Sequence, residues 1–415
     1  MGTQSLTAPA RSASKVFWTY WSAGTISSVG AAVSSVALPL VAVSVLHASA
    51  LEVGVLAAAS YVAWLVIGLP AGVIVGRLPL RETQVAMDVA RALALASIPL
   101  AWWLDALALP HLVVTALVVS FANVLFDVGN MTLLPAIVPK EELNARNSLV
   151  SATHATTQLG GPSLGGVLVQ LFGAVPAVLV DAVSYLASAV LIGRLPRRQV
   201  AQPAVRAPVR TMIREGWHFV ARHPVMGPCM WGATALNFVC GALLALAPLY
   251  LVRVLHAPPG VVGVLIATEG IGSLAGAALT PRLSRAVGTA RAILLAGLVG
   301  ATFALLMPAG SGAAGMLLFG IGNAGFAMGV VVFSINTRTY RQTESPPELL
   351  SRVMATVRFV SWGAIPVGSL TAGMVATALG VRPALWLTCA VAFVPLVVLG
   401  LSPVRNRRDL DEAAL

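Results

Sequence analysis

Four acidic residues lie inside long apolar stretches of this sequence: Asp88, Asp127, Asp181 and Glu269. An ionisable side chain at membrane depth costs several kcal/mol and usually marks an ion or substrate pathway. Because burial disfavours the charged form of a carboxyl group, such an acid can take up and release a proton. Glu269, near the middle of its stretch, is the first candidate for this chemistry and Asp181 the second. The alternatives are a polar anchor in a water-filled cavity for Glu269 and a structural hydrogen bond for Asp181.

Other polar residues in the apolar stretches indicate a gate and a lined cavity. Asp88 and Arg91 are three residues apart, so on a helix they share one face and can form a structural or gating ion pair. In the other half of the chain, Arg358 lies at a similar depth along its predicted span. The polar candidates for lining a cavity, each of which could instead bond to a neighbouring helix, are Asn123, His154, Gln158, Asn237 and Asn323.

Motifs for enzymatic chemistry are absent from the sequence. It has no residues at metal-ligand spacing, no nucleophile–base motif and no phosphate-binding Gly-x4-Gly-Lys-Ser/Thr loop. The stretch Gly320-x-Gly322-x-x-Gly325 resembles a dinucleotide fingerprint in spacing only, because no strand precedes it. We therefore expect no metal, no cofactor, no direct use of ATP and no enzyme activity.

The elements that position these residues are membrane-spanning helices. Hydrophobic residues make up 58% of the 415 residues and charged residues 10%, with a mean hydropathy of +0.87. Soluble domains carry about 25% charged residues, and a membrane span needs roughly 20 mostly apolar residues. The apolar stretches predict twelve spans, at 17–45, 51–76, 85–104, 110–130, 148–170, 174–194, 226–251, 260–281, 290–308, 313–336, 355–378 and 382–402.

The distribution of basic residues predicts the orientation of these spans. Of the 26 Lys and Arg residues, all but Arg253 and Arg382 fall on the side that also carries both termini. Positive residues mark the cytoplasmic face, so both termini are expected in the cytoplasm. The net charge of +11 is then a topology signal. It points to anionic lipid headgroups as partners, and not to nucleic acid.

These features divide the chain into five parts. A cytoplasmic tail, 1–16, precedes a six-helix bundle at 17–194, and a second six-helix bundle at 226–402 precedes a cytoplasmic tail at 403–415. Between the bundles lies a cytoplasmic linker, 195–225, which is basic and rich in proline at its start. Residues 211–223 in this linker predict an amphipathic helix on the membrane surface, with Trp217 and Val220 among its apolar members.

The two bundles repeat each other in sequence at a constant offset of 207 residues. Matched pairs are Pro139 with Pro346, Glu141 with Glu348, Leu143 with Leu350, Gly166 with Gly373, Gly173 with Gly380, Pro176 with Pro383 and Ala177 with Ala384. Six spans are an even number, so the two copies have the same orientation. This arrangement predicts an all-α integral membrane fold, with two six-helix bundles related by a pseudo-twofold axis along the membrane normal.

Several motifs resemble the major facilitator superfamily, in particular bacterial enterobactin exporters and macrolide efflux proteins. They are Phe126-Asp127 through Leu134-Pro135, Val138-Pro139-x-Glu141-x-Leu143, Asn147-Ser148, Asp181-Ala182-x-Ser184-Tyr185-Leu186, Glu215-Gly216-Trp217, His223-Pro224 and Arg352-Val353. The resemblance covers about Trp21 to Val398 and implies a bacterial inner membrane protein that works by alternating access.

Two further motifs bear on export and gating. Gly161-Pro162-Ser163-Leu164-Gly165-Gly166 resembles the antiporter motif of exporting members, although glycines expected upstream of it are missing. After the second span the family pattern has an Asp followed by Arg. Here Gly76 replaces that Asp, and Arg77 keeps the basic position. Asp127 matches the family's second acid and is expected to pair with Arg77.

The sequence as a whole predicts a monomeric secondary transporter that exports hydrophobic or amphipathic small molecules, of antibiotic or siderophore type, in exchange for protons. The substrate class is implied by the resemblance. Proton-coupled uptake of a nutrient is the first alternative, and a membrane sensor that transports nothing is the second.

Overall fold

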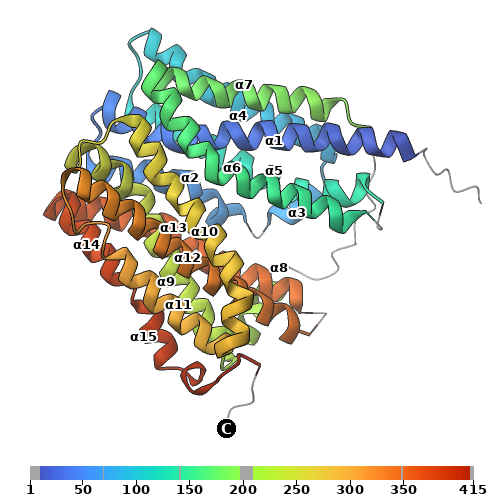
Figure 1. Cartoon of the computed structure of the whole chain (residues 1–415). Coiled ribbons are helices and arrows are strands. Elements are labelled where there is room, and N and C mark those ends of the chain that lie inside the picture. The colour runs from blue at the N-terminus through green and yellow to red at the C-terminus, as the bar shows by residue number, and fades with distance from the viewer. Residues whose placement is uncertain (1–9, 69, 140–141, 197–208, 347–348, 412–415) are drawn as a thin grey trace, which may run out of the picture.

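The computed structural model describes residues 10–68, 70–139, 142–196, 209–346 and 349–411, and within these ranges the chain forms helices and no strands (Figure 1). Parts of the predicted tails and of the linker, together with Glu141 and Glu348, lie outside the described residues. The prediction of an all-helical membrane fold is confirmed.

The first half contains α1 (Ala10–Leu40), α2 (Ala50–Ile67), α3 (Ala71–Gly76), α4 (Leu80–Trp103), α5 (Leu109–Ile137), α6 (Leu143–Phe172) and α7 (Ala174–Gly193). After α8 (Val209–Arg222), the second half contains α9 (Met226–Leu249), α10 (Pro259–Val287), α11 (Thr289–Ala304), α12 (Gly312–Glu344), α13 (Leu350–Leu379), α14 (Val381–Val391) and α15 (Val394–Gly400). In the described part, ten helical segments are long and apolar enough to span a membrane. The remaining two predicted spans are α11, which is short, and α6, which is rich in Ser, Thr and Gln.

Each half packs into its own bundle. In the first, α1 contacts α6 and α7, and α4 contacts α5 and α7; in the second, α9 contacts α13 and α15, and α12 contacts α10 and α11. Two helix pairs, α2 with α13 and α6 with α10, join the bundles. Figure 1 shows the bundles meeting at one end and diverging toward the end at which α1 begins and α15 finishes.

The sequence repeat has a structural counterpart in the backbone. The bounds of α6 and α13 differ by the same 207 residues as the sequence pairs. Each helix ends at a glycine in an unusual conformation, with φ 89° and ψ 162° at Gly173, and φ 93° and ψ 161° at Gly380. Side chains other than hydrogen disfavour positive φ, so both copies need glycine at this turn.

A second repeat lies at the end of the first span of each half. Val-x-Val-Leu-His-Ala occurs at 43–48 and again at 252–257. Both copies follow a π-helical end, η1 (Val41–Val45) and η2 (Tyr250–Val254), and both histidines, His47 and His256, have positive φ. The offset here is 209 residues, so a search at one fixed offset misses this pair.

Two predicted spans are interrupted, and others are longer than expected. The stretch 51–76 breaks between α2 and α3 at Pro70, and the last span breaks between α14 and α15, just before Pro395. Proline cannot donate a backbone hydrogen bond, which explains both interruptions. By contrast, α12 continues to Glu344, because a helix that leaves the apolar layer can carry charged residues on its exposed turns.

The linker helix α8 packs against the second bundle, and its predicted contact with the membrane surface stays a prediction. Glu215 forms an ion pair with Arg352 of α13, and a Cβ on Gly216 would lie 2.8 Å from the Arg352 carbonyl oxygen. Val220 is fully buried, while Trp217 stays partly exposed and meets Trp231 edge-on. The side of α8 that carries Val220 is therefore covered by the second bundle.

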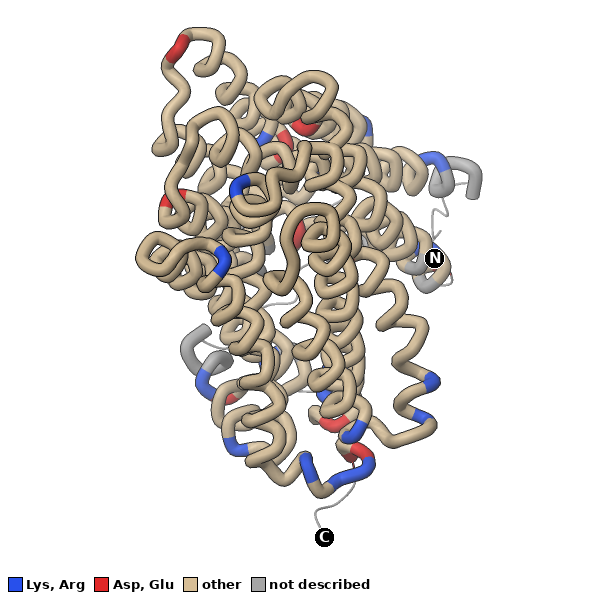
Figure 2. The backbone as a smooth tube through the Cα atoms, turned by 60° about the vertical axis from the view of Figure 1, so that its left-hand side comes forward, with Lys and Arg blue, Asp and Glu red and all other residues tan. Residues whose placement is uncertain are grey.

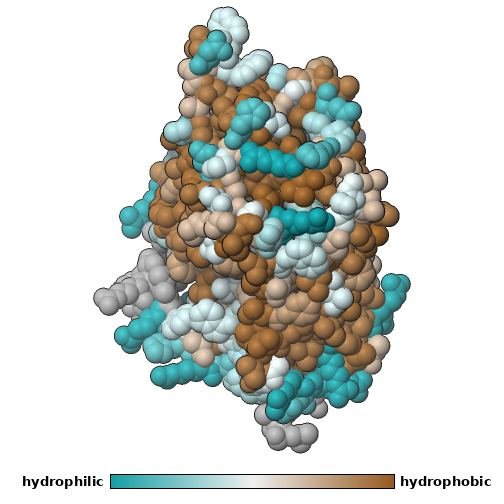
Figure 3. Space-filling model, turned by 90° about the vertical axis from the view of Figure 1, so that its left-hand side faces the viewer, coloured by the Kyte–Doolittle hydropathy of each residue, from teal (hydrophilic) through white to brown (hydrophobic). Residues whose placement is uncertain are grey.

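The surface is that of a membrane protein. Figure 2 shows Lys and Arg mainly toward the ends of the helices, and Figure 3 shows a mostly apolar face with hydrophilic side chains along its lower end and in patches over its upper half. At the opposite end, the guanidinium groups of Arg253 and Arg382 donate hydrogen bonds to the carbonyl oxygens of Ala48 and Pro308. These two basic residues therefore have local structural partners.

Candidate substrate cavity between the bundles

The end of the molecule away from the termini is closed by two glycine contacts. A Cβ on Gly166 of α6 would lie 2.8 Å from the Cα of Gly263 in α10. A Cβ on Gly54 of α2 would lie 3.1 Å from the Cα of Gly373 in α13. The two contacts are related by the internal repeat. Glycine at these positions lets the helix backbones meet without an intervening side chain.

The antiporter-like motif contributes to this closure from both sides of α6. Gly161 faces Ala32 of α1, and a Cβ on Gly165 would lie 3.0 Å from the Val33 backbone of the same helix. The Pro162 carbonyl and Gly166 face α10 instead. The motif therefore packs α6 between its own bundle and the partner bundle.

We predict that Gly166→Val prevents this end from closing, because the added carbons would overlap the backbone of Pro259 and Gly263. Ser35, which lines the cavity described next, serves as the reporter after replacement by cysteine in a chain lacking Cys229, Cys240 and Cys389. Labelling by an impermeant maleimide from the side opposite the termini should rise about tenfold.

The matched control for this substitution is Gly160→Val on the same helix. A Cβ at Gly160 meets no atom within 4 Å, so this variant should label like the parent chain. Equal labelling of the two valine variants would show that the glycine contact does not hold the end closed.

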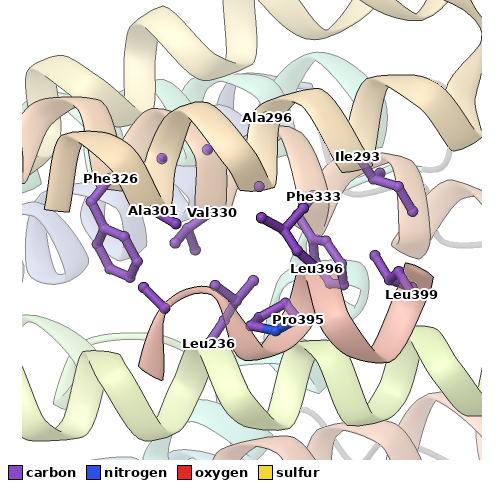
Figure 4. A pocket seen from close by; sticks show the side chains of 14 residues that line it. Leu236, Ile293, Ala296, Ala301, Phe326, Val330, Phe333, Pro395, Leu396 and Leu399 are labelled. Carbon is purple, nitrogen blue, oxygen red and sulfur yellow. The ribbon is translucent and has the colours of Figure 1, made fainter. Parts of the chain in front are cut away.

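Between the closed end and the termini lie two adjoining cavities. One, of about 580 Å³, is lined mostly by α1, α2, α4, α5, α6 and α7; the other, of about 680 Å³, is lined mostly by α9, α12 and α13. Trp64 of α2 and Trp362 of α13 line both, with ring centroids 5.1 Å apart. A third cavity, between α9, α11, α12 and α15, is an apolar crevice of about 10 Å³ (Figure 4) and has no room for a small-molecule substrate.

The predicted pair of Asp88 and Arg91 forms an ion pair at the edge of the first cavity. Asp88 is fully buried and Arg91 is 3% exposed. Arg91 also donates a 2.8 Å hydrogen bond to Oδ1 of Asn123, and its guanidinium lies 4.1 Å from the ring centre of Phe126 and 4.2 Å from that of Tyr185. The structure thus gathers two predicted charges, one predicted cavity residue and two aromatic rings.

Two further predicted acids line the same cavity. Asp181 is 2% exposed, and the Ser184 hydroxyl donates to its Oδ1 at 3.2 Å. Asp127 is exposed to the cavity, where Arg91, Arg358 and His154 are its nearest charged or titratable neighbours. His154 and Gln158 also line this space.

Glu269 is an exposed residue of α10 and lines neither large cavity. It lies close to Tyr61 of α2, a cavity-lining residue, and to Cys240 of α9. Its neighbour Gly270 packs on Leu159, where α10 contacts α6. Within the described residues, Glu269 has no hydrogen bond and no ion pair. Glu269 therefore lies beside the α6–α10 contact, which must change if the bundles move.

Two expectations need correction. Arg77 is exposed at the end of α3 and, among the described residues, forms no ion pair with Asp127, which faces the cavity instead. Asn323 lines neither large cavity; its amide donates to Leu265 and Thr268 of α10, so it joins two helices. Asn237 does line the second cavity.

The sequence alone does not show that Arg338 and Arg341 line the second cavity, or that Arg358 contacts the two tryptophans that line it. Arg358 lies 4.1 Å from the ring centre of Trp64 and 4.4 Å from that of Trp362, which links α13 to α2. Arg338 and Arg341 of α12 line the same cavity, although the apolar pattern predicts that this span ends at 336. Their spacing of three residues on a continuing helix is the signal that could have found them.

Known proteins resemble this chain over most of its length. The multidrug efflux pump Tap of Mycolicibacterium fortuitum is 26% identical over 387 residues, which cover 89% of this chain and 90% of that protein. The MFS-type transporter YfiS of Bacillus subtilis (strain 168) is 26% identical over 398 residues, or 93% of each protein.

Solved structures share the fold at low sequence identity. The nucleoside transporter NupG gives a TM-score of 0.70 at 11% identity, covering 92% of this chain and 99% of that one. A bacterial homologue of the iron transporter ferroportin in its inward-facing state gives 0.71 at 16% identity, covering 92% and 97%. These likenesses show the two-bundle transporter fold.

The sequence profile of the family described as transmembrane secretion effector matches residues 4–415. These relatives are transporters and not enzymes, which agrees with a multi-pass fold built around a cavity. The chain therefore belongs to the transmembrane secretion effector family of the major facilitator superfamily and is a membrane transporter of small molecules.

Proposed function

We propose that this transporter exports amphipathic small molecules from the cytoplasm in exchange for protons. The distribution of Lys and Arg supports a cytoplasmic location for both termini, in a bacterial inner membrane. The cavities, which lie on the terminus side of the closed end, then load from the cytoplasm or the inner leaflet. The multidrug efflux pump among the relatives and the enterobactin-exporter-like motifs support export.

The observation that carries the coupling is the position of Glu269. It is a lone acid on α10, next to Gly270, at the contact with α6 between the bundles. Adding a proton neutralises the carboxylate at this point. If binding of a proton is more favourable in one conformation than in the other, protonation shifts the populations of the two conformations. Glu269, together with Asp181, is thus suited to bias the return from the outward-facing to the inward-facing state.

The movement follows from the paired contacts. Residues 17–194 and 226–402 act as two rigid units in a monomer, and the α2–α13 and α6–α10 contacts separate at the closed end while the terminus side closes around the cargo. The α2–α13 contact is also the place where Arg358 and Trp362 meet Trp64. Each contact contains one glycine pair, Gly54 with Gly373 and Gly166 with Gly263, at which the helix backbones meet and can tilt on each other.

The test uses inside-out membrane vesicles with an acidic lumen and three dyes: ethidium as a cation, Nile red as a neutral molecule and 1-pyrenebutanoate as an anion. Accumulation of any of them in the lumen, above vesicles lacking the protein and abolished by a protonophore, is the expected result. Accumulation in right-side-out vesicles with an acidic exterior would indicate uptake with protons. Binding without transport in either orientation would indicate a sensor. Either of these outcomes overturns the proposal.

A further inference from the structure

Three arginines of the second bundle line the 680 Å³ cavity: Arg338 and Arg341 on α12 and Arg358 on α13. Arg338 and Arg341 are one helical turn apart and share a face. Arg338 is close enough to act electrostatically on both of the others. This cluster, here called the arginine wall, faces the same space as Trp64 and Trp362.

The arginine wall is not neutralised by the surrounding protein. Arg341 is 8% exposed, yet its Nε and Nη1 are buried without a hydrogen-bond partner within the described residues. Nε of Arg358 and Oγ of Ser361 are also buried and unpartnered there. The titratable groups that act on Arg341 are the neutral thiol of Cys229 and the like-charged Arg338, and neither is an anion. An uncompensated buried charge is strongly destabilising, so its presence points to a missing anion.

The described acids that line the two cavities do not neutralise Arg338 and Arg341. Of the described acids that line either cavity, Asp127 already lies near Arg358, Arg91 and His154, and Asp181 is enclosed with Ser184. Glu344, at the end of α12, is exposed and acts on His223 and Tyr340 instead. Arg338 and Arg341 thus remain without a counter-charge among these residues.

We propose that the arginine wall binds the anionic group of an amphipathic cargo, such as a carboxylate, phosphate or sulfonate on an apolar body. A guanidinium binds such groups through two parallel hydrogen bonds. The adjoining rings of Trp64, Trp362 and Phe359 are placed to cover the apolar body. This inference rests on the proposed export function and names its substrate class as amphipathic anions.

The test compares three ligands of one shape, 1-pyrenebutanoate, 1-pyrenebutanol and 1-pyrenebutylamine, by energy transfer from tryptophan to pyrene. The full chain is held in nanodiscs of phosphatidylcholine at equal pH on both faces. The anion should bind about tenfold more tightly than the alcohol, because charge-assisted hydrogen bonds are about twice as strong as neutral ones. Salt should weaken binding of the anion and not of the alcohol.

Arg341→Gln should reduce the preference for the anion to about twofold, and Arg341→Lys should keep part of it, because lysine retains the charge without the planar pair of donors. The matched control is Arg282→Gln, at an exposed position of α10 outside both large cavities, which should keep the full preference. An anion that binds no better than the alcohol, or an unchanged preference in Arg341→Gln, would overturn the inference.

Anionic lipid offers the same chemistry as a soluble cargo, and one arm of the experiment separates the two. Phosphatidylglycerol added to the nanodiscs should displace 1-pyrenebutanoate if a lipid headgroup occupies the arginine wall, and should leave its binding unchanged if the site is reserved for soluble cargo. The Arg341→Gln comparison decides whether the anion site exists, and this arm decides which anion occupies it. Because no pH gradient is present, a failure here leaves the test of proton-driven export unaffected.

Discussion

Replacing Glu269 by glutamine is expected to abolish pH-driven transport while leaving exchange of substrate intact. Glutamine has nearly the same size but cannot bind or release a proton, so the charge beside the α6–α10 contact no longer responds to pH. Accumulation driven by a pH gradient should fall to less than about a tenth of the parent value, within the range that a positioned proton-transfer group contributes. Exchange of labelled for unlabelled substrate without a gradient should stay within about twofold.

The control for this prediction is another glutamate-to-glutamine change in the same protein. Glu142 lies at the exposed start of α6, where it pairs with Arg146 at 2.8 Å, and it lines neither large cavity. Glu142→Gln should transport normally, and Glu269→Asp should restore part of the pH response. Full pH-driven accumulation by Glu269→Gln would remove this residue from the coupling mechanism and leave Asp181 as the remaining candidate.

Features that depend on local physics could be predicted from the sequence. The length and apolarity of each stretch indicated the spans, because a bilayer of fixed thickness sets both. The pairing of Gly173 with Gly380 was visible because one backbone turn in each copy requires positive φ. The ion pair of Asp88 and Arg91 followed from their spacing on one helix face.

Features that depend on how the two bundles meet could not be predicted in this way. Nothing in the spacing of Trp64 and Arg358 indicates that they are in contact, because they belong to different bundles and touch only where α2 crosses α13. Gly161 and Gly165 read as an antiporter-like motif, yet in the structure they pack against α1. Which residues face the cavity depends on helix rotation, which apolar runs do not determine.

The arginine wall was not predicted because basic residues at the end of an apolar stretch usually lie outside the membrane span. The span prediction ended α12 at its first basic residue, so Arg338 and Arg341 were counted as loop charges that mark the cytoplasmic side. In the structure α12 continues to Glu344, and Arg341 is buried. The same residues can serve the orientation of the protein and the binding of its cargo.

Asp88→Asn is expected to lower the free energy of unfolding by about 3 kcal/mol, because breaking a buried ion pair leaves an uncompensated charge. The group left behind is the guanidinium of Arg91, held between the rings of Phe126 and Tyr185 with a hydrogen bond to Asn123. Titration with sodium dodecyl sulfate, followed by circular dichroism, measures the change as a lower midpoint of unfolding.

The double variant Asp88→Leu with Arg91→Met distinguishes the charge from the packing. Replacing both members of a buried pair by apolar residues of similar volume is often neutral, so the double variant should regain most of the lost stability. The exposed pair of Glu142 and Arg146 is the control, since breaking a surface pair costs less than about 1 kcal/mol. A double variant as unstable as Asp88→Asn would mean that the stacking of Arg91 between two aromatic rings, and not its charge pairing, holds α4 against α5 and α7.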